Sequence, residues 1–100
     1  MLVLVPMDTT DVEEAKITKV YDAKTWAQLR IEEGELVEVL HNDKFDGFED
    51  FSEAVVVSND AEPVMDFMNM SMMVLVAHTQ RTIDDIVEAY LFRELHDLAY

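Results

Sequence analysis

The chain has 100 residues, of which 22 are Asp or Glu and only 7 are Lys or Arg, so its formal net charge is −15. Half of its residues are hydrophobic, which indicates one folded domain over residues 1–100 and excludes a disordered acidic tail. Both halves are acidic, and a field of this sign repels phosphates and anionic lipids, so we expect no nucleic acid and no membrane as a partner.

The chain opens with an apolar run, residues 2–5, which is typical of a strand buried on both faces of an α/β sheet. Pro6 ends this run, because proline removes a donor of the strand ladder. The polar residues 8–24 are predicted as a loop, or as a loop with a short helix for which Asp8 or Asp11 would be the N-cap.

A β-hairpin follows. Residues 26–32 and 35–41 alternate between two faces, and Glu33-Gly34 between them supplies a turn. The next stretch, residues 42–53, is the most acidic part of the chain and carries a phenylalanine at every third position from 45 to 51. This spacing favours a short helical turn that lays an aromatic ridge on the sheet.

The second half is predicted to alternate between strands and helices. Residues 54–57 and 72–77 are apolar runs, and a helix that ends at about Asn69 or Met70 lies between them, with Asn59 and Asp60 as its N-cap candidates. One intervening helix makes the two strands parallel, joined by a right-handed crossover. Thr82 and Asp85 resemble a capping box that opens a last helix, whose apolar stripe continues to Leu98 and which carries His96 near its end.

The order of these elements predicts a single α/β domain. Three strands buried on both faces, together with an amphipathic hairpin, imply a mixed five-stranded sheet with flanking helices. No linker, repeat or low-complexity tract divides the chain.

One edge of this sheet gathers the residues best suited to bind a ligand. In open α/β sheets, ligands tend to lie outside the carboxyl ends of the strands. Asp8, Asn59 and His78 follow the first, second and third apolar strands. An imidazole beside carboxylate and amide oxygens could ligate a metal or hold an anion against helix dipoles, so these three are the candidate cofactor-binding residues, with the metal left open. The alternative is that they satisfy backbone groups at the strand ends.

Two other patterns have simpler interpretations. Five of the seven methionines lie between residues 65 and 73, where thioethers could ligate copper(I) or form an adaptable contact surface, but core packing explains most of them. Residues 42–53 resemble a calcium loop in spacing, yet Lys44 occupies a position that needs an oxygen ligand.

The residues that catalysis would need are absent, so we expect no enzyme. The chain has no cysteine, only two glycines and therefore no glycine-rich phosphate loop, and no carboxylate on its first strand for a two-metal nuclease. The lack of cysteine fits a reducing compartment, and no apolar run has the length of a signal peptide or of a ~20-residue membrane span. The expected location is the cytoplasm.

Several segments in order resemble one family. They are Leu-Val-Leu-Val-Pro-Met-Asp (2–8), Glu-Glu-Gly-Glu-Leu-Val-Glu-Val (32–39), Ala-Val-Val-Val (54–57), Met-Val-Leu-Val-Ala (73–77) and Thr-Ile-Asp-Asp-Ile-Val-Glu-Ala-Tyr-Leu (82–91). Together they resemble the dinitrogenase iron–molybdenum cofactor biosynthesis family, the NifX-like accessory domains. This resemblance implies a ribonuclease-H-like fold, a five-stranded mixed sheet with one antiparallel strand, and binding or assembly of iron–molybdenum-type cofactors.

The sequence departs from the family in one loop. The family often carries a His-Phe-Gly-Arg type motif before its second strand, whereas residues 16–25 of this chain contain no His, Gly or Arg. The resemblance therefore implies a small non-enzymatic accessory protein with a degenerate cofactor loop. The alternative is a protein–protein interaction or regulatory domain that kept the fold and lost cofactor binding. A charge of −15 would suit a protein partner with a basic surface.

Overall fold

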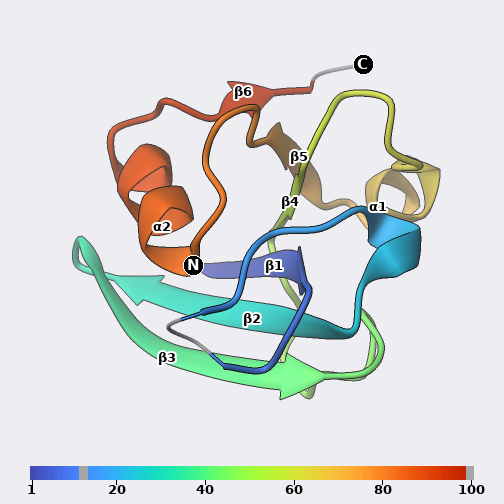
Figure 1. The fold of residues 1–100 in the computed structure, drawn as a ribbon, viewed down its shortest axis with the longest axis horizontal. Helices are drawn as coiled ribbons and strands as arrows, with labels where there is room; N and C mark the ends of the chain where they lie inside the picture. The colour runs from blue at the N-terminus through green and yellow to red at the C-terminus, as the bar shows by residue number, and fades with distance from the viewer. Residues whose placement is uncertain (12–13, 99–100) are drawn as a thin grey trace.

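The computed structural model describes residues 1–11 and 14–98. A mixed sheet crosses the molecule in the strand order β3-β2-β1-β4-β5-β6 (Figure 1). The strands are β1 (Leu2–Met7), β2 (Thr25–Glu32), β3 (Glu35–Asn42), β4 (Ala54–Val57), β5 (Met73–Val76) and β6 (His96–Asp97). The single α/β domain with a mixed sheet is as predicted, but the sheet has six strands and the prediction of five is wrong.

The central strands have the predicted directions, but β1 continues through Pro6, which lies opposite Trp26, so the prediction that Pro6 ends this strand is wrong. β1, β4 and β5 lie side by side and are parallel, with Leu4 beside Val55 and Val57 beside Val76. β2 is antiparallel to both of its neighbours, so it is the reversed strand among the first five. β6 adds a second reversed strand, antiparallel to β5 at the far edge.

The apolar runs form strands because helices cover both faces of the sheet (Figure 1). Every residue of β1 and of β4 is buried. One face packs against α2 (Ile83–Leu91), which buries Ile83, Ile86, Val87 and Ala89. The other face packs against α1 (Met65–Asn69), which buries Phe67 beside Trp26 and Phe45.

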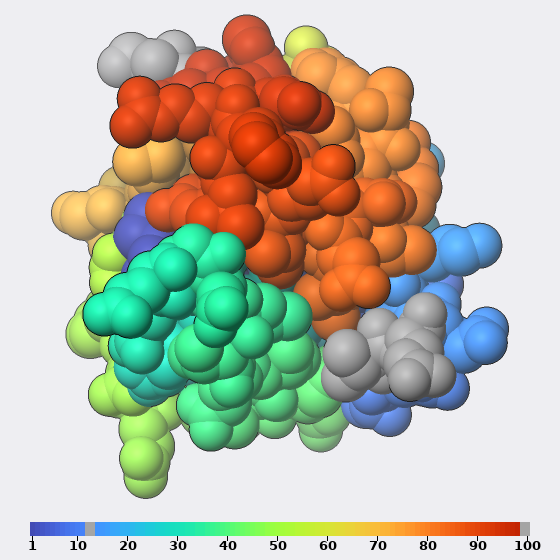
Figure 2. Space-filling model, turned by 90° about the vertical axis from the view of Figure 1, so that its left-hand side faces the viewer, coloured from blue at the N-terminus to red at the C-terminus, as the bar shows by residue number. Residues whose placement is uncertain are grey.

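The predicted hairpin is confirmed. Glu33 and Gly34 have φ values of 52° and 80°, and two consecutive positive φ values are the geometry of a type I′ turn. The register shifts between Arg30 and Ile31, which marks a β-bulge in the pairing of β2 with β3. Figure 2 shows the hairpin turn beside the α2 segment, and Leu36 and Tyr90 pack against the same core cluster there.

Two predicted helices are shorter than expected or absent. Within the described part of residues 8–24, the helix is a 3-10 turn, η1 (Val20–Asp22), which follows Lys19, so Asp8 is not its N-cap. The predicted helix start after Asp11 falls on residues 12–13, which lie outside the described residues. Residues 43–53 form turns and bends, so the predicted aromatic ridge on a helix is wrong. Phe45 packs against Trp26 with ring centroids 5.8 Å apart, whereas Phe51 is 76% exposed.

The last helix begins as predicted and ends early. The Oγ1 of Thr82 accepts a hydrogen bond from the Asp85 N–H (3.1 Å), which confirms it as the N-cap. The helix ends at Leu91, because Arg93 takes a φ of 57° and the Glu94 N–H bonds back to the Ala89 carbonyl (2.8 Å). The residues beyond it form β6, so the placement of His96 on a helix is wrong. Within the described residues, no helix has the length and apolar character to span a membrane.

Candidate functional site

The carboxyl ends of β1, β4 and β5 form one edge of the sheet, which we call the strand-end edge. Asp8 follows β1 directly, and Asn59 and His78 each lie two residues beyond the end of β4 and of β5. The last residues of β4 and β5, Val57 and Val76, lie directly opposite each other, so the segments that follow the two strands leave the sheet at the same level. The topology therefore brings the three predicted residues to one edge, as the sequence predicts.

Two of the three side chains bind their own loops. The Oδ1 of Asp8 accepts a hydrogen bond from the Lys16 N–H (2.9 Å). The Oδ1 of Asn59 accepts one from the Ala61 N–H (2.9 Å), and its Nδ2 donates to the Ser58 hydroxyl (3.4 Å). Asn59 thus closes a turn ahead of α1, which begins only at Met65, and it is not the N-cap of that helix.

His78 has a different neighbour. Its imidazole is exposed and stands 5.9 Å from the ring of His96, measured between ring centroids. Among the residues that the structure describes, no recorded hydrogen bond or ring contact joins any two of Asp8, Asn59 and His78. The edge holds them as separate groups, and of the three only His78 lies beside another imidazole, that of His96.

Arg81 and Glu62 are polar groups of this edge that sequence reasoning missed. The Arg81 guanidinium donates to the carbonyl oxygens of Ala77 (3.2 Å), His78 (3.0 Å) and Gln80 (3.0 Å), which fixes the loop after β5. Glu62 is buried, and its Oε1 accepts a hydrogen bond from the Ser58 hydroxyl (3.2 Å). The sequence signal for Arg81 was its place between a buried strand and a helix N-cap.

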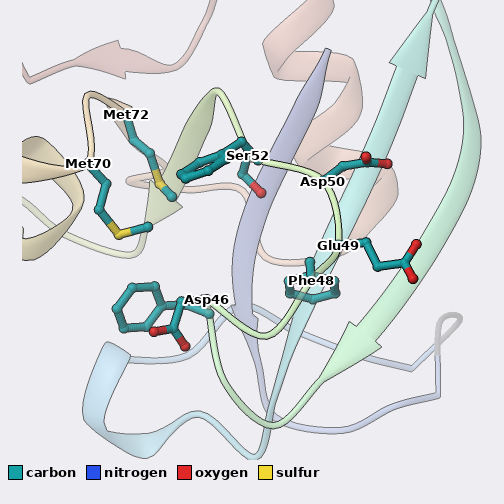
Figure 3. Close-up of a pocket in the computed structure, with 9 residues that line it drawn as sticks. Asp46, Phe48, Glu49, Asp50, Ser52, Met70 and Met72 are labelled. Atoms are coloured by element: carbon teal, nitrogen blue, oxygen red, sulfur yellow. The ribbon is translucent and has the colours of Figure 1, made fainter.

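A second feature is an apolar hollow of about 140 Å³ on the α1 side of the sheet, which we call the Phe-Met hollow (Figure 3). It lies between the β3–β4 loop and the connection from α1 to β5, and its lining residues are Phe45, Asp46, Phe48, Glu49, Asp50, Phe51, Ser52, Met70 and Met72. In Figure 3 the side chains of Glu49 and Asp50 point away from Met70 and Met72, so the carboxylates lie outside the apolar space.

Hydrogen bonds from β2 fix the loop that lines this hollow. The buried Gln28 amide donates from Nε2 to the Ser52 hydroxyl (2.8 Å) and to the Asp50 carbonyl (3.0 Å). The Arg30 guanidinium lies 3.3 Å from the Asp50 carboxylate and 3.5 Å from that of Glu38. Desolvation alone would lower the pKa of Arg30, but the hydrogen bond with Glu38 and the nearby carboxylates outweigh it and raise that pKa.

His41 belongs to neither feature. It lies on β3 opposite Ala27, and both ring nitrogens are buried without a hydrogen-bond partner. Burial disfavours the charged imidazolium and so lowers the pKa of His41.

The described residues do not form a closed metal site by themselves. No group of three or more His, Asp or Glu side chains among them is placed to hold a metal ion. The ligands that the strand-end edge offers are exposed imidazoles, so any metal held there would keep coordination positions for water or for a second molecule.

Two solved structures share this fold over nearly the whole chain. One is the Methanocaldococcus jannaschii protein MJ0327, provisionally described as a dinitrogenase, with a TM-score of 0.77 at 18% sequence identity, covering 99% of this chain and 95% of that one. The other is the protein PH0822, with a TM-score of 0.72 at 15% identity, covering 97% of this chain and 96% of that one. No protein-family model and no curated protein sequence matches the chain. At these identities the likeness shows the fold alone.

Proposed function

We propose that this chain is a small non-enzymatic accessory protein of the dinitrogenase cofactor type, which binds a metal cofactor as cargo at its strand-end edge. The observation that carries the proposal is the position of His78. An exposed imidazole leaves the end of a buried parallel strand, on a fold shared with a protein described as a dinitrogenase. The strand order β3-β2-β1-β4-β5 with β2 reversed also supports the ribonuclease-H-like fold that the family resemblance implies.

The three residues of the edge differ in whether their side chains already make hydrogen bonds, and this difference assigns their roles. His78 has an exposed ring that can ligate a metal of the cargo, because imidazole suits iron and other transition metals. Asp8 and Asn59 already accept hydrogen bonds from backbone N–H groups of their own loops. We assign them the role of fixing the loops around the cargo and assign direct ligation to His78.

Cofactor binding can be measured by anaerobic incubation with isolated iron–molybdenum cofactor, followed by gel filtration and metal analysis of the protein peak. We expect molybdenum and iron to elute with the wild-type protein and to be lost in His78→Ala. His41→Gln is the matched control, since it removes a histidine from the opposite part of the sheet. Absence of metal from the wild-type peak, or equal metal in His78→Ala, would contradict the proposal.

A second function, binding of a protein partner with a basic surface, is favoured by the Phe-Met hollow. Phe51 lines it and is 76% exposed, and Glu49 and Asp50 also line it, with carboxylates that point away from Met70 and Met72 (Figure 3). An exposed aromatic side chain among acidic groups is the pattern of an interface anchor with a charged rim. The net charge of −15 would speed the approach of a basic partner.

Partner binding is tested with wild-type protein and Phe51→Ser on a solid support, exposed to an extract of the native host at low and high salt. We expect a specific basic protein that the wild type retains and Phe51→Ser does not. Tyr21→Ser is the matched control, because Tyr21 is 86% exposed but lies outside the hollow. Equal recovery by Phe51→Ser and wild type would remove the hollow as the interface.

A further inference from the structure

His78 and His96 come together although 17 residues of chain lie between them. Their ring centroids are 5.9 Å apart and the ring planes are inclined by 48°. Both side chains are exposed, so neither ring is locked by packing. Rotation about χ1 and χ2 can therefore turn one nitrogen of each ring toward a shared point.

The pairing of β5 with β6 places the two residues on one face. His96 lies directly opposite Val76, and His78 follows Val76 by two residues. The two histidines are therefore diagonal neighbours on adjacent backbone segments. Diagonal positions on adjacent strands lie ~7–8 Å apart at their backbones, within the reach of aromatic side chains. The Leu98 N–H also bonds to the Val74 carbonyl (2.9 Å), which extends the attachment of this segment to β5.

Hydrogen bonds hold the backbone on the His78 side as well. The carbonyl oxygen of His78 accepts from Arg81 Nη2 (3.0 Å), and Arg81 Nη1 donates to the carbonyl of Ala77 (3.2 Å). Both imidazoles therefore stand on backbone segments that are fixed relative to one another, while their side chains stay accessible to solvent.

We infer that His78 and His96 form a two-histidine site for a divalent transition-metal ion of the zinc, nickel or copper class. Imidazole nitrogen is a preferred ligand of these ions, with metal–nitrogen distances of ~2.0–2.1 Å for zinc. Calcium and magnesium prefer oxygen ligands and have no reason to select this pair. With two protein ligands, the ion keeps positions for water or for a donor atom of a second molecule.

The charge of the molecule favours a cation at this site. The net charge of −15 lowers the potential at the surface, and Asp97 follows His96 directly. Arg81 opposes it as a nearby positive charge, and its guanidinium is held in place by hydrogen bonds to the carbonyl oxygens of Ala77, His78 and Gln80. A bound ion would join β6 to β5, so metal binding should stabilise the folded protein.

This inference shares His78 with the proposed cofactor site but does not depend on it. It concerns a bare metal ion, and His96 is needed only here. If the bare ion binds and the cofactor does not, the proposed function is contradicted and the two-histidine site is supported. If the cofactor binds through His78 and the bare ion does not bind, this inference fails alone.

The test is calorimetric titration of the whole chain with ZnCl₂ and NiSO₄, in excess MgCl₂ so that carboxylates on the acidic surface are already occupied. We expect one ion per chain, and at least about a tenfold loss of affinity in each of His78→Gln and His96→Gln. His41→Gln should bind as the wild type does. The melting temperature of the wild type should rise with added zinc, and that rise should vanish in the His96→Gln variant.

Three results would overturn the inference. One is the absence of saturable zinc or nickel binding by the wild type above the magnesium background. Another is unchanged affinity in both histidine variants, which would place the ion on carboxylates. The third is a loss in His78→Gln with none in His96→Gln, which would leave a single histidine and no pair. Because both residues are exposed, the variants should keep the wild-type far-UV circular dichroism, which checks their fold.

Discussion

Gln28, in the second strand of the sheet, donates its side-chain N–H to the hydroxyl of Ser52 at 2.8 Å, and both residues are buried. The same Nε2 donates to the Asp50 carbonyl at 3.0 Å. Together with the ion pair between Arg30 and Asp50, these hydrogen bonds hold the β3–β4 loop against the sheet, which explains why a polar side chain is buried at position 28 of β2. The shape of the Phe-Met hollow depends on these contacts.

Removing the Gln28 side chain should lower the free energy of unfolding more than removing the Ser52 hydroxyl does. Gln28→Ala leaves the Ser52 hydroxyl and the Asp50 carbonyl without their donor, and an unsatisfied buried group costs ~1–3 kcal/mol. Ser52→Ala leaves Gln28 its bond to Asp50, so about 1 kcal/mol is expected. Urea unfolding of the two variants measures both losses. A Gln28→Ala variant as stable as Ser52→Ala would show that the loop does not depend on this amide.

The same loop is stabilised by a contact between Asn42 and Gly47. The Asn42 side chain donates to the Gly47 carbonyl (3.0 Å) and accepts from the Lys44 N–H (3.0 Å), and a Cβ on Gly47 would overlap it. Gly47→Ala should therefore destabilise the protein by about 1–3 kcal/mol. In an Asn42→Ala background the overlap is gone, so the second substitution should cost much less. Additive losses in this double-mutant cycle would contradict the contact.

The N-cap of α2 gives a third test. Thr82→Ala removes the acceptor of the Asp85 N–H and should lower stability by about 1 kcal/mol. For a domain of this size that loss corresponds to a fall in Tm of ~4–8 °C. Thr82→Ser keeps the hydroxyl and should melt close to the wild type. Thermal unfolding followed by circular dichroism distinguishes the two, and equal melting of both variants would exclude the cap as a source of stability.

Local patterns were sufficient for much of the fold. The buried runs became β1, β4 and β5 because continuous apolar sequence requires cover on both faces, and Gly34 marked the hairpin turn. The edge that carries Asp8, Asn59 and His78 followed from parallel strands alone. Whether these three bind a cofactor stays a prediction, as do the cytoplasmic location and the absence of catalysis.

The errors came from periodicity that tertiary contacts overrode. Phenylalanines at every third position of residues 42–53 suggested a helix, but Asn42 and Gly47 close a turn and Phe51 points to solvent. The apolar stripe after Leu91 suggested a longer helix, yet the segment breaks at Arg93 and pairs with β5. Because the sequence pattern does not predict the pairing of β6 with β5, it does not predict that His96 lies beside His78 either. No signal local to His96 could have shown it.

His41 predicts a pH dependence. Burial holds its folded-state pKa below the ordinary value of ~6.5, so between these two values the unfolded chain binds more protons than the folded one. The folded protein should therefore lose stability as the pH falls below ~6.5, and be unaffected by this group above it. His41→Phe removes the titration, so the wild type should lose stability relative to it between about pH 7.5 and about pH 5.5. Parallel stability curves for the two proteins would contradict the assignment.

The central claim, that cargo binds at the strand-end edge, is tested most directly by mapping the backbone amide signals of labelled protein on addition of isolated iron–molybdenum cofactor. We predict that the amides of Asp8, Asn59, His78 and their neighbours shift or broaden while those of residues 45–52 stay in place. Changes confined to residues 45–52, or no change at all, would contradict the claim.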